Sequence, residues 1–189
     1  ASFCGQYPEV KPQVRISSSR TVAAQILEGA VDIGLVGAIW NERGLEWTTL
    51  CIDTLVLAVP ALHPLAEAAS VKVADLLELP FINREPGSGT RRVVAQLLEQ
   101  QGLRESNLRE VAQLGSNEAV REAVKAGMGV AILSSRSVDQ ELRCGTLAAV
   151  TLNDPAAQRP IFLLQRKNRE LPPVASAFVE HLRTAADQE

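Results

Sequence analysis

The sequence predicts an α/β protein in which strands and helices alternate in two successive blocks. Apolar runs of strand length alternate with amphipathic segments of roughly 8–12 residues, several of which end at a glycine. Such alternation indicates parallel strands joined by right-handed crossovers. Polar turns rich in serine, glycine, threonine and asparagine follow three of the predicted strands, at 17–19, 86–90 and 115–117. Ligands in such sheets bind where strands end and helices begin, so we expect a binding site at these turns.

The first block contains one helix between apolar strands. Val10–Ser17 alternates apolar and polar residues and predicts a strand, and Thr21–Glu28 predicts a helix that Gly29 ends. Val31–Val36 is nearly all apolar, as expected of a parallel strand buried on both faces. A second long apolar run, Leu50–Pro60, predicts the last strand of this block.

The second block repeats this scheme up to the C-terminus. It predicts strands at Pro80–Asn83, Leu108–Leu114, Val130–Leu133, Leu147–Leu152 and Ile161–Gln165, and helices at Thr90–Gln101, Asn117–Ala126, Ser137–Leu142 and after Pro173.

Composition excludes several classes of protein. The chain has 189 residues, of which 46% are hydrophobic and 22% charged, as in ordinary soluble globular proteins. Its net charge of -3 supplies no positive field for nucleic acid or an anionic membrane. No apolar run approaches the ~20 residues that a membrane span needs. We therefore expect a cytoplasmic protein without a membrane partner.

The cysteines and histidines predict neither a metal site nor a cofactor. Cys4, Cys51 and Cys144 are far apart and lack a C-x-x-C spacing, which favours reduced, mostly buried thiols. A redox pair, Cys51 with Cys144, is the alternative. His63 and His181 are the only histidines, too few for a histidine metal site.

Two of the polar turns suit an anion. A helix N-terminus offers free N–H groups and a partial positive charge to phosphate, sulfate or carboxylate. The turn Gly87–Thr90 lets the backbone approach such a ligand, and Arg84, Arg91 and Arg92 would add charge. Plain helix capping explains this turn equally well, and also explains the turn at 115–117. Neither a phosphate-binding G-x-x-x-x-G-K loop nor a dinucleotide fingerprint is present.

No catalytic constellation is found, so we do not expect an enzyme. Glu85 is the one candidate general base, but no nucleophile or second acid stands at a recognisable spacing. Ser134 and Ser135 follow a strand without the G-x-S-x-G turn of a nucleophile. Trp40 and Trp47 flank a polar loop, either packed on a lobe surface or covering the edge of a cleft.

The chain resembles the effector-binding domain of LysR-type transcriptional regulators over essentially its whole length. Each motif is weak by itself, but seven stand in family order, and REPGSGTR is most similar to the branch that regulates carbon fixation and sulfur metabolism. The motifs are YPEV (Tyr7–Val10), LEGAVDIGLV (Leu27–Val36), HPLA (His63–Ala66), VADLLELPFI (Val73–Ile82), REPGSGTR (Arg84–Arg91), GSNEAVREAVKAGMGVAILS (Gly115–Ser134) and a late G-x-L (Gly145–Leu147).

The resemblance implies the fold of type II periplasmic binding proteins, with two Rossmann-like lobes joined by two crossover strands. Residues 1–75 and 160–189 would form lobe I, and residues 76–159 lobe II. The family's winged helix-turn-helix DNA-binding domain, its linker helix and the first strand of lobe I are expected to be absent from this chain.

The resemblance also implies a small-molecule effector, anionic by the helix-terminus argument, in the cleft between the lobes. Its ligand shell falls on Ser18, Ser19 and Gly37 in lobe I and on Ser116 and Asn117 in lobe II, to which the helix-terminus argument adds Ser88, Gly89 and Thr90. Gly37 stands where a side chain often bonds the effector, which predicts a roomier pocket or contacts from the backbone. Removing the hydroxyls of Ser18 and Ser19 should weaken effector binding and leave folding nearly intact.

Such regulators are homodimers or tetramers that contact DNA only through the absent N-terminal domain. The first alternative function is a solute-binding protein of a transporter, which shares the fold. An enzyme of the same two-lobe fold and a thiol redox sensor of the regulator family are the others.

Overall fold

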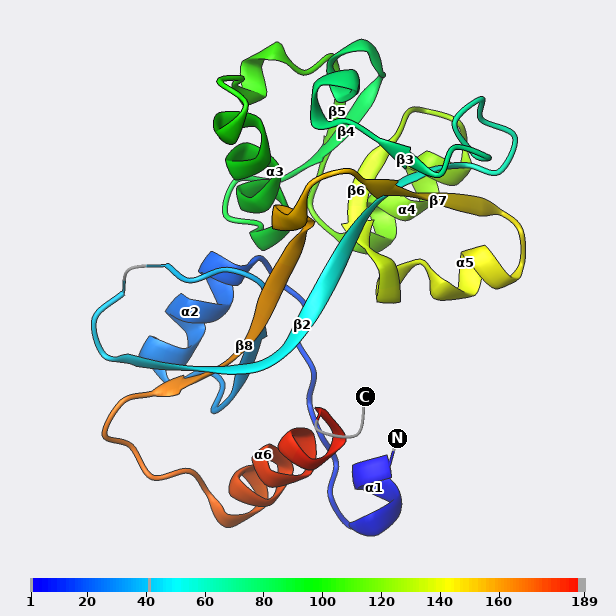
Figure 1. The fold of residues 1–189 in the computed structure, drawn as a ribbon. Helices are drawn as coiled ribbons and strands as arrows, with labels where there is room; N and C mark the ends of the chain where they lie inside the picture. The colour runs from blue at the N-terminus through cyan, green and yellow to red at the C-terminus, as the bar shows by residue number, and fades with distance from the viewer. Residues whose placement is uncertain (1, 41, 187–189) are drawn as a thin grey trace.

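Two long antiparallel strands, β2 (Leu45–Pro60) and β8 (Gln158–Arg166), connect two lobes in the computed structural model, which describes residues 2–40 and 42–186 (Figure 1). The two strands pair from Leu45 opposite Arg166 to Thr54 opposite Gln158. Beyond Thr54, β2 leaves β8 and pairs with β6 and β7 instead. One strand therefore belongs to the sheets of both lobes.

Lobe I contains one short sheet with helices around it. Its strand order is β1, β8, β2, and all neighbours are antiparallel. Helix α2 packs Ala23 and Ile26 against this sheet, in a cluster with Val36, Leu45 and Leu164. Its remaining elements are α1 (Ser2–Gln6), α2 (Ser19–Glu28), β1 (Gly34–Val36) and α6 (Pro173–Ala186).

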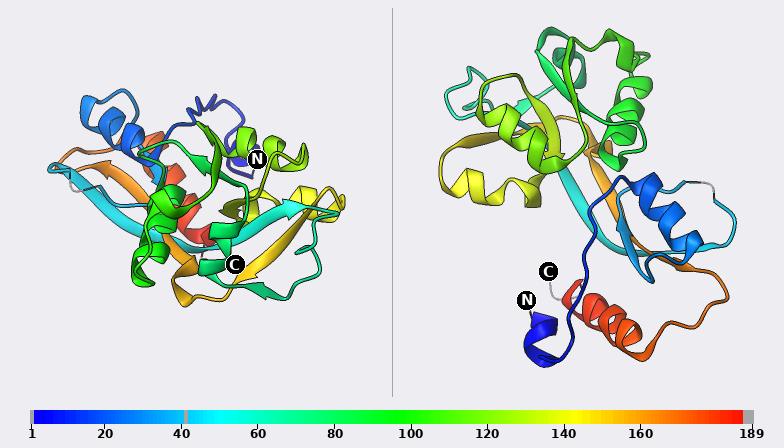
Figure 2. Two further views of the ribbon diagram at one scale, coloured as in Figure 1. Left: turned by 90° about the horizontal axis from the view of Figure 1, so that it is seen from above. Right: turned by 180° about the vertical axis from the view of Figure 1, so that it is seen from behind.

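Lobe II is larger and carries the parallel strand pairs. Strand β4 runs parallel to β5 and bridges to Val130 before β6, while β3 runs parallel to β7. Figure 2 shows its helices gathered around these strands, with the start of the green helix α3 close to lobe I. Its elements are β3 (Ser70–Val71), β4 (Phe81–Arg84), α3 (Gly89–Gln100), β5 (Glu110–Leu114), α4 (Asn117–Lys125), β6 (Ala131–Ser134), α5 (Asp139–Arg143) and β7 (Leu147–Leu152), with short 3-10 helices at Val73–Glu78, Glu105–Asn107, Ser135–Ser137 and Pro155–Ala157.

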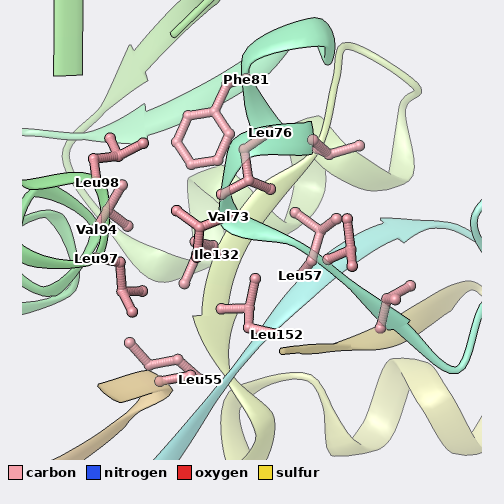
Figure 3. Packing of buried hydrophobic residues seen from close by; sticks show 14 of the residues in the cluster. Leu55, Leu57, Val73, Leu76, Phe81, Val94, Leu97, Leu98, Ile132 and Leu152 are labelled. Atoms are coloured by element: carbon pink, nitrogen blue, oxygen red, sulfur yellow. The ribbon is translucent and has the colours of Figure 1, made fainter. Parts of the chain in front are cut away.

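The main hydrophobic core lies in lobe II, between α3 and the sheet (Figure 3). Leu97 and Leu98 from α3 meet Leu55 and Leu57 from β2 there, all nearly inaccessible to solvent. Val71 and Val73 pack in the same cluster, although the predicted division of the chain places them before the boundary at residue 75. That division stays a prediction.

The alternation of strands and helices is confirmed, but two predicted strands are corrected. Val10–Ser17 is not a strand: Val14 and Ile16 are 82% and 76% exposed, and no strand pairs with this segment within the described residues. The run Val31–Val36 contains only the three-residue β1, which is antiparallel to β8 and exposes Leu35. Both segments have the apolar pattern of a strand, but within the described residues neither has a neighbouring strand on each side. Within the described residues, no helix is long and apolar enough to span a bilayer.

Candidate functional site

The N-termini of α2 and α3 meet between the two lobes. The backbone N–H of Arg20 in α2 donates to the carbonyl of Gly87, before α3, at 3.3 Å. A Cβ atom placed on Gly89 would lie 2.9 Å from both the Ser19 Oγ and the carbonyl carbon of Gly37. Glycine at position 89 therefore allows the first turn of α3 to touch lobe I. The structure thus brings together Ser18, Ser19, Gly37, Ser88, Gly89 and Thr90, all predicted from sequence.

Helix α2 is capped by its own serine. The Ser18 Oγ accepts a hydrogen bond from the backbone N–H of Thr21 at 3.2 Å and lies 2.9 Å from the Thr21 hydroxyl. Ser18 therefore satisfies one of the free amides of α2. Ser19 does not cap; its buried hydroxyl lies against Gly89 of lobe II.

This difference changes what the two serine substitutions should do. Ser18→Ala should lower the free energy of unfolding by about 1 kcal/mol, because it removes the cap of α2. Ser19→Ala should leave stability nearly unchanged and act on ligand binding. Urea denaturation of the two single variants tests this, and equal stability of both would contradict the capping role of Ser18.

Helix α3 has an uncapped N-terminus. Ser88 occupies the cap position and is only 3% exposed, yet its side chain makes no capping hydrogen bond. The backbone N–H groups of Gly89 and Thr90 have no hydrogen-bond partner among the described residues. The first turn of α3 also contains no acidic residue. These buried donors, with the helix dipole behind them, form the kind of site that attracts an anion.

A buried guanidinium lies beside this helix end. Arg159, 8% exposed, donates from Nε and from Nη2 to the Asp53 Oδ2, each at 3.0 Å, and from Nη1 to the Thr90 Oγ1 at 3.1 Å. Asp53 also accepts from the Ser134 hydroxyl at 2.6 Å. Burial lowers the pKa of Arg159, and the Asp53 carboxylate opposes this shift. The network links β8, β2, α3 and the end of β6, and it leaves two of the five guanidinium N–H donors for another partner.

Gly37 makes room for this guanidinium. A Cβ atom on Gly37 would lie 2.7 Å from the Arg159 Nη1 and 2.8 Å from its Cζ. Arg159 fills the space that a side chain at position 37 would take, so a roomier pocket is not found there. The alternative expectation, contacts from the backbone of Gly37, stays a prediction.

The N-terminus of α4 is joined to the same region through Arg84. The Ser116 Oγ caps α4 by accepting from the Ala119 N–H at 3.1 Å. Asn117 accepts a hydrogen bond from the Arg84 guanidinium, which also holds Glu85 through Nε at 2.7 Å and Nη2 at 2.9 Å. Ser116 therefore serves as the cap of α4. Asn117 is linked to the residues before α3 by its hydrogen bond from the Arg84 side chain.

The other charged and aromatic residues predicted from sequence lie partly at the junction of the lobes and partly away from it. Arg91 turns away from the α3 terminus, because it binds Glu105 at 2.9 Å and Gln113 at 2.7 Å. Trp47 packs edge-on against Phe162 inside lobe I. Trp40 instead lies near Arg20 of α2 and Arg92 of α3, which places it at the junction of the lobes.

Redox and metal chemistry find little support in the described residues. All three cysteines are free; Cys4 and Cys51 are half-buried, and Cys144 is exposed, contrary to the expectation of mostly buried thiols. Within the described part of the chain, no group of three or more His, Cys, Asp or Glu side chains is arranged to hold a metal ion.

Sequence reasoning missed Asp53 and Arg159. Each is a single charge beside a strongly apolar stretch, in CIDTLVLAV and in QRPIFLL. A charge that is buried with such a run needs a partner of opposite charge. That signal marks both residues, although it does not say that they pair with each other.

Comparisons with known proteins give one family. The family model described as "LysR substrate binding domain" matches residues 1–187. A protein of Anaeromyxobacter dehalogenans named phosphonates import ATP-binding protein PhnC is 35% identical over 96% of this chain and 36% of its own length. A probable RuBisCO transcriptional regulator of Synechocystis sp. is 30% identical over 95% of this chain and 53% of its own length. The chain thus spans about half or less of these two curated relatives.

A solved structure has the same fold. The regulatory domain of CcmR from Synechocystis PCC6803, determined in complex with 2-PG, superposes with a TM-score of 0.86 at 24% identity, over 98% of this chain and 88% of that one. The predicted architecture of two lobes joined by crossover strands is therefore confirmed.

Proposed function

Because this chain belongs to the LysR substrate binding domain family, we propose that it is the ligand-sensing part of a cytoplasmic transcriptional regulator. It binds a small anionic metabolite between its lobes and thereby controls a DNA-binding domain elsewhere in the full protein. Homodimers or tetramers are the assembly we propose. The RuBisCO regulators among its relatives, and the 2-PG bound to CcmR, support the carbon-fixation branch and a small anionic effector.

The observation that carries this proposal is the open N-terminus of α3. Serine side chains cap α2 and α4, whereas Ser88 leaves the α3 amides without a partner. Buried backbone N–H groups are rarely left unpaired, since each unmade hydrogen bond costs about 1–3 kcal/mol. A bound oxyanion would supply the acceptors that these amides lack.

Charge around the site agrees with a small anion. The Arg159–Asp53 and Arg84–Glu85 pairs are each neutral, so they add no net charge of their own. The ends of α2 and α3 then leave a local excess of positive potential. An effector of one or two negative charges would balance it, and the two unused N–H groups of Arg159 would bind its oxygens.

The same geometry explains how binding would be transmitted. The ligand lies where α2 of lobe I meets α3 of lobe II, so its affinity depends on how closely the lobes approach. A ligand shifts such an equilibrium only by its differential affinity for the two arrangements, typically about 1–3 kcal/mol. Closure of the lobes would therefore be the change that the DNA-binding domain reads.

The alternatives have less support. The match to an import ATP-binding protein favours a transporter component, but it covers only about a third of that protein. An enzyme would require a free acid or base at the site, but Arg84 holds both carboxylate oxygens of Glu85. The homologues otherwise named are regulators.

Thermal unfolding against a panel of small anions tests the proposal. Sulfate, sulfite, phosphate, sugar phosphates and short carboxylates are compared at equal ionic strength, with chloride as the control. A ligand at 100 times its dissociation constant should stabilise the protein by roughly 2.7 kcal/mol, a shift of about 5–11 °C in Tm. Selective stabilisation by one class supports the proposal, and the same Tm with every anion would contradict it.

A further inference from the structure

A second group of positive charges surrounds Trp40 at the junction of the lobes. The guanidinium carbon of Arg20, from α2, lies 5.8 Å from the centre of the Trp40 ring, and that of Arg92, from α3, lies 5.0 Å from it. We call Arg20, Trp40 and Arg92 the rim cluster. It is distinct from the Arg159 network, which uses none of these side chains.

Neither arginine of the rim cluster has an anionic partner among the residues that the structure describes. Arg20 and Arg92 are both exposed, and within the described residues neither side chain forms an ion pair or a hydrogen bond. Cation–π attraction at exposed sites amounts to only about 0.5–1 kcal/mol and supplies no negative charge to balance the two arginines. Two unpaired guanidinium groups on one indole therefore leave a charge that an anion would neutralise.

The position of these arginines in their helices adds to this charge. Arg20 and Arg92 both lie near the N-termini of their helices, and neither helix has an acidic residue in its first turn. Helix starts normally favour acidic side chains, because the dipole is positive there. Two basic residues at two neighbouring helix starts are thus locally unfavourable unless a negative group lies between them.

An independent observation on Trp40 points the same way. Its indole Nε1 is buried and finds no hydrogen-bond acceptor among the described residues. A buried indole N–H usually has a partner, because leaving it unpaired costs free energy. The rim cluster therefore holds one unpaired N–H besides its two guanidinium groups.

We propose that the rim cluster binds a phosphate-type oxyanion, bridging lobe I and lobe II through Arg20 and Arg92. Phosphate fits better than a single carboxylate, because its oxygens and its double charge can engage two guanidinium groups at once. Its source is either the distal phosphate of an effector held at the α3 terminus or a free phosphate ion. The charge and burial of the rim cluster carry this inference, and it does not require that the α3 terminus bind a ligand.

Trp40 itself reports on the site. In a Trp47→Phe background it is the only tryptophan, so titration with inorganic pyrophosphate should change the emission saturably. In that background, Arg20→Gln with Arg92→Gln should weaken pyrophosphate binding at least tenfold. Arg183→Gln on α6, also exposed and remote from the rim, is the matched control and should change nothing.

Two results would overturn the proposal: no saturable change in Trp40 emission with pyrophosphate, or equal affinity in the double variant and the control. Ser19→Ala, which removes a hydroxyl beside Gly89 without adding bulk between the lobes, distinguishes the two sources. Weaker pyrophosphate binding in this variant indicates one ligand spanning both positions, and unchanged binding indicates a separate phosphate. If pyrophosphate changes Trp40 emission while the Gly89 and Thr90 amide resonances stay stationary, the effector proposal is wrong and the rim site stands.

Discussion

Asp53→Ala should lower the free energy of unfolding by about 3–5 kcal/mol, the cost of leaving a buried charge without its partner. Asp53 is 2% exposed and holds two nitrogens of Arg159 as well as the Ser134 hydroxyl. After the substitution, Arg159 keeps only the Thr90 hydroxyl. Urea denaturation followed by far-UV circular dichroism measures the change.

Two controls separate loss of the pair from loss of packing. Asp139→Ala removes an exposed ion pair with Arg143 and should cost less than about 1 kcal/mol. Replacing both partners, Asp53→Leu with Arg159→Met, should recover much of the lost stability, because an apolar pair of similar volume needs no charge compensation. If Asp53→Ala costs no more than Asp139→Ala, the Arg159 network is not a buried structural unit.

Gly89→Ala should reduce anion affinity by about five- to 150-fold while the protein stays folded. The added methyl group would lie 2.9 Å from the Gly37 carbonyl carbon and 3.2 Å from the Ala38 nitrogen, which are backbone atoms of lobe I. Overpacking of this kind costs about 1–3 kcal/mol, and separation of the lobes relieves it. Binding between the lobes then loses about the same free energy, and about 1.4 kcal/mol corresponds to a factor of ten.

Isothermal titration with the most stabilising anion of the panel measures this loss. Gly5→Ala in α1 is the matched control, because a Cβ atom there meets nothing within 4 Å. Equal affinity in Gly89→Ala and wild type would show that the anion does not bind where α3 approaches lobe I.

Several helices and strands were predicted closely from the spacing of apolar residues along the chain. The helix over Thr90–Gln101 was predicted within one residue at each end, since apolar spacing and the following glycine determine it. The strand Leu147–Leu152 was predicted at its observed bounds from its apolar run. The segment Val10–Ser17 shows the limit: its alternation is that of a strand, but a strand forms only beside a partner.

The candidate site, too, was predicted only in part from the sequence. The serine and glycine turns were predicted to be close together because strand ends in one sheet share an edge. Those at α2 and α3 do touch, but they meet across the two lobes, and no strand precedes the turn at α2 within the described residues. The Arg159–Asp53 pair was missed, because the two residues are 106 positions apart and only the crossing of β2 and β8 brings them together. Whether a serine caps its helix is likewise decided by packing: Ser18 caps α2, but the buried Ser88 does not cap α3.

The central claim is that the free amides at the start of α3 bind the anion. The most direct test is an amide-resolved NMR titration of the ¹⁵N-labelled protein with the most stabilising anion of the panel. We predict saturable shifts of the Gly89 and Thr90 resonances, at the concentration that stabilises the protein in thermal unfolding. Stationary Gly89 and Thr90 resonances, while other amides shift or none does, would contradict the claim and place the effector elsewhere.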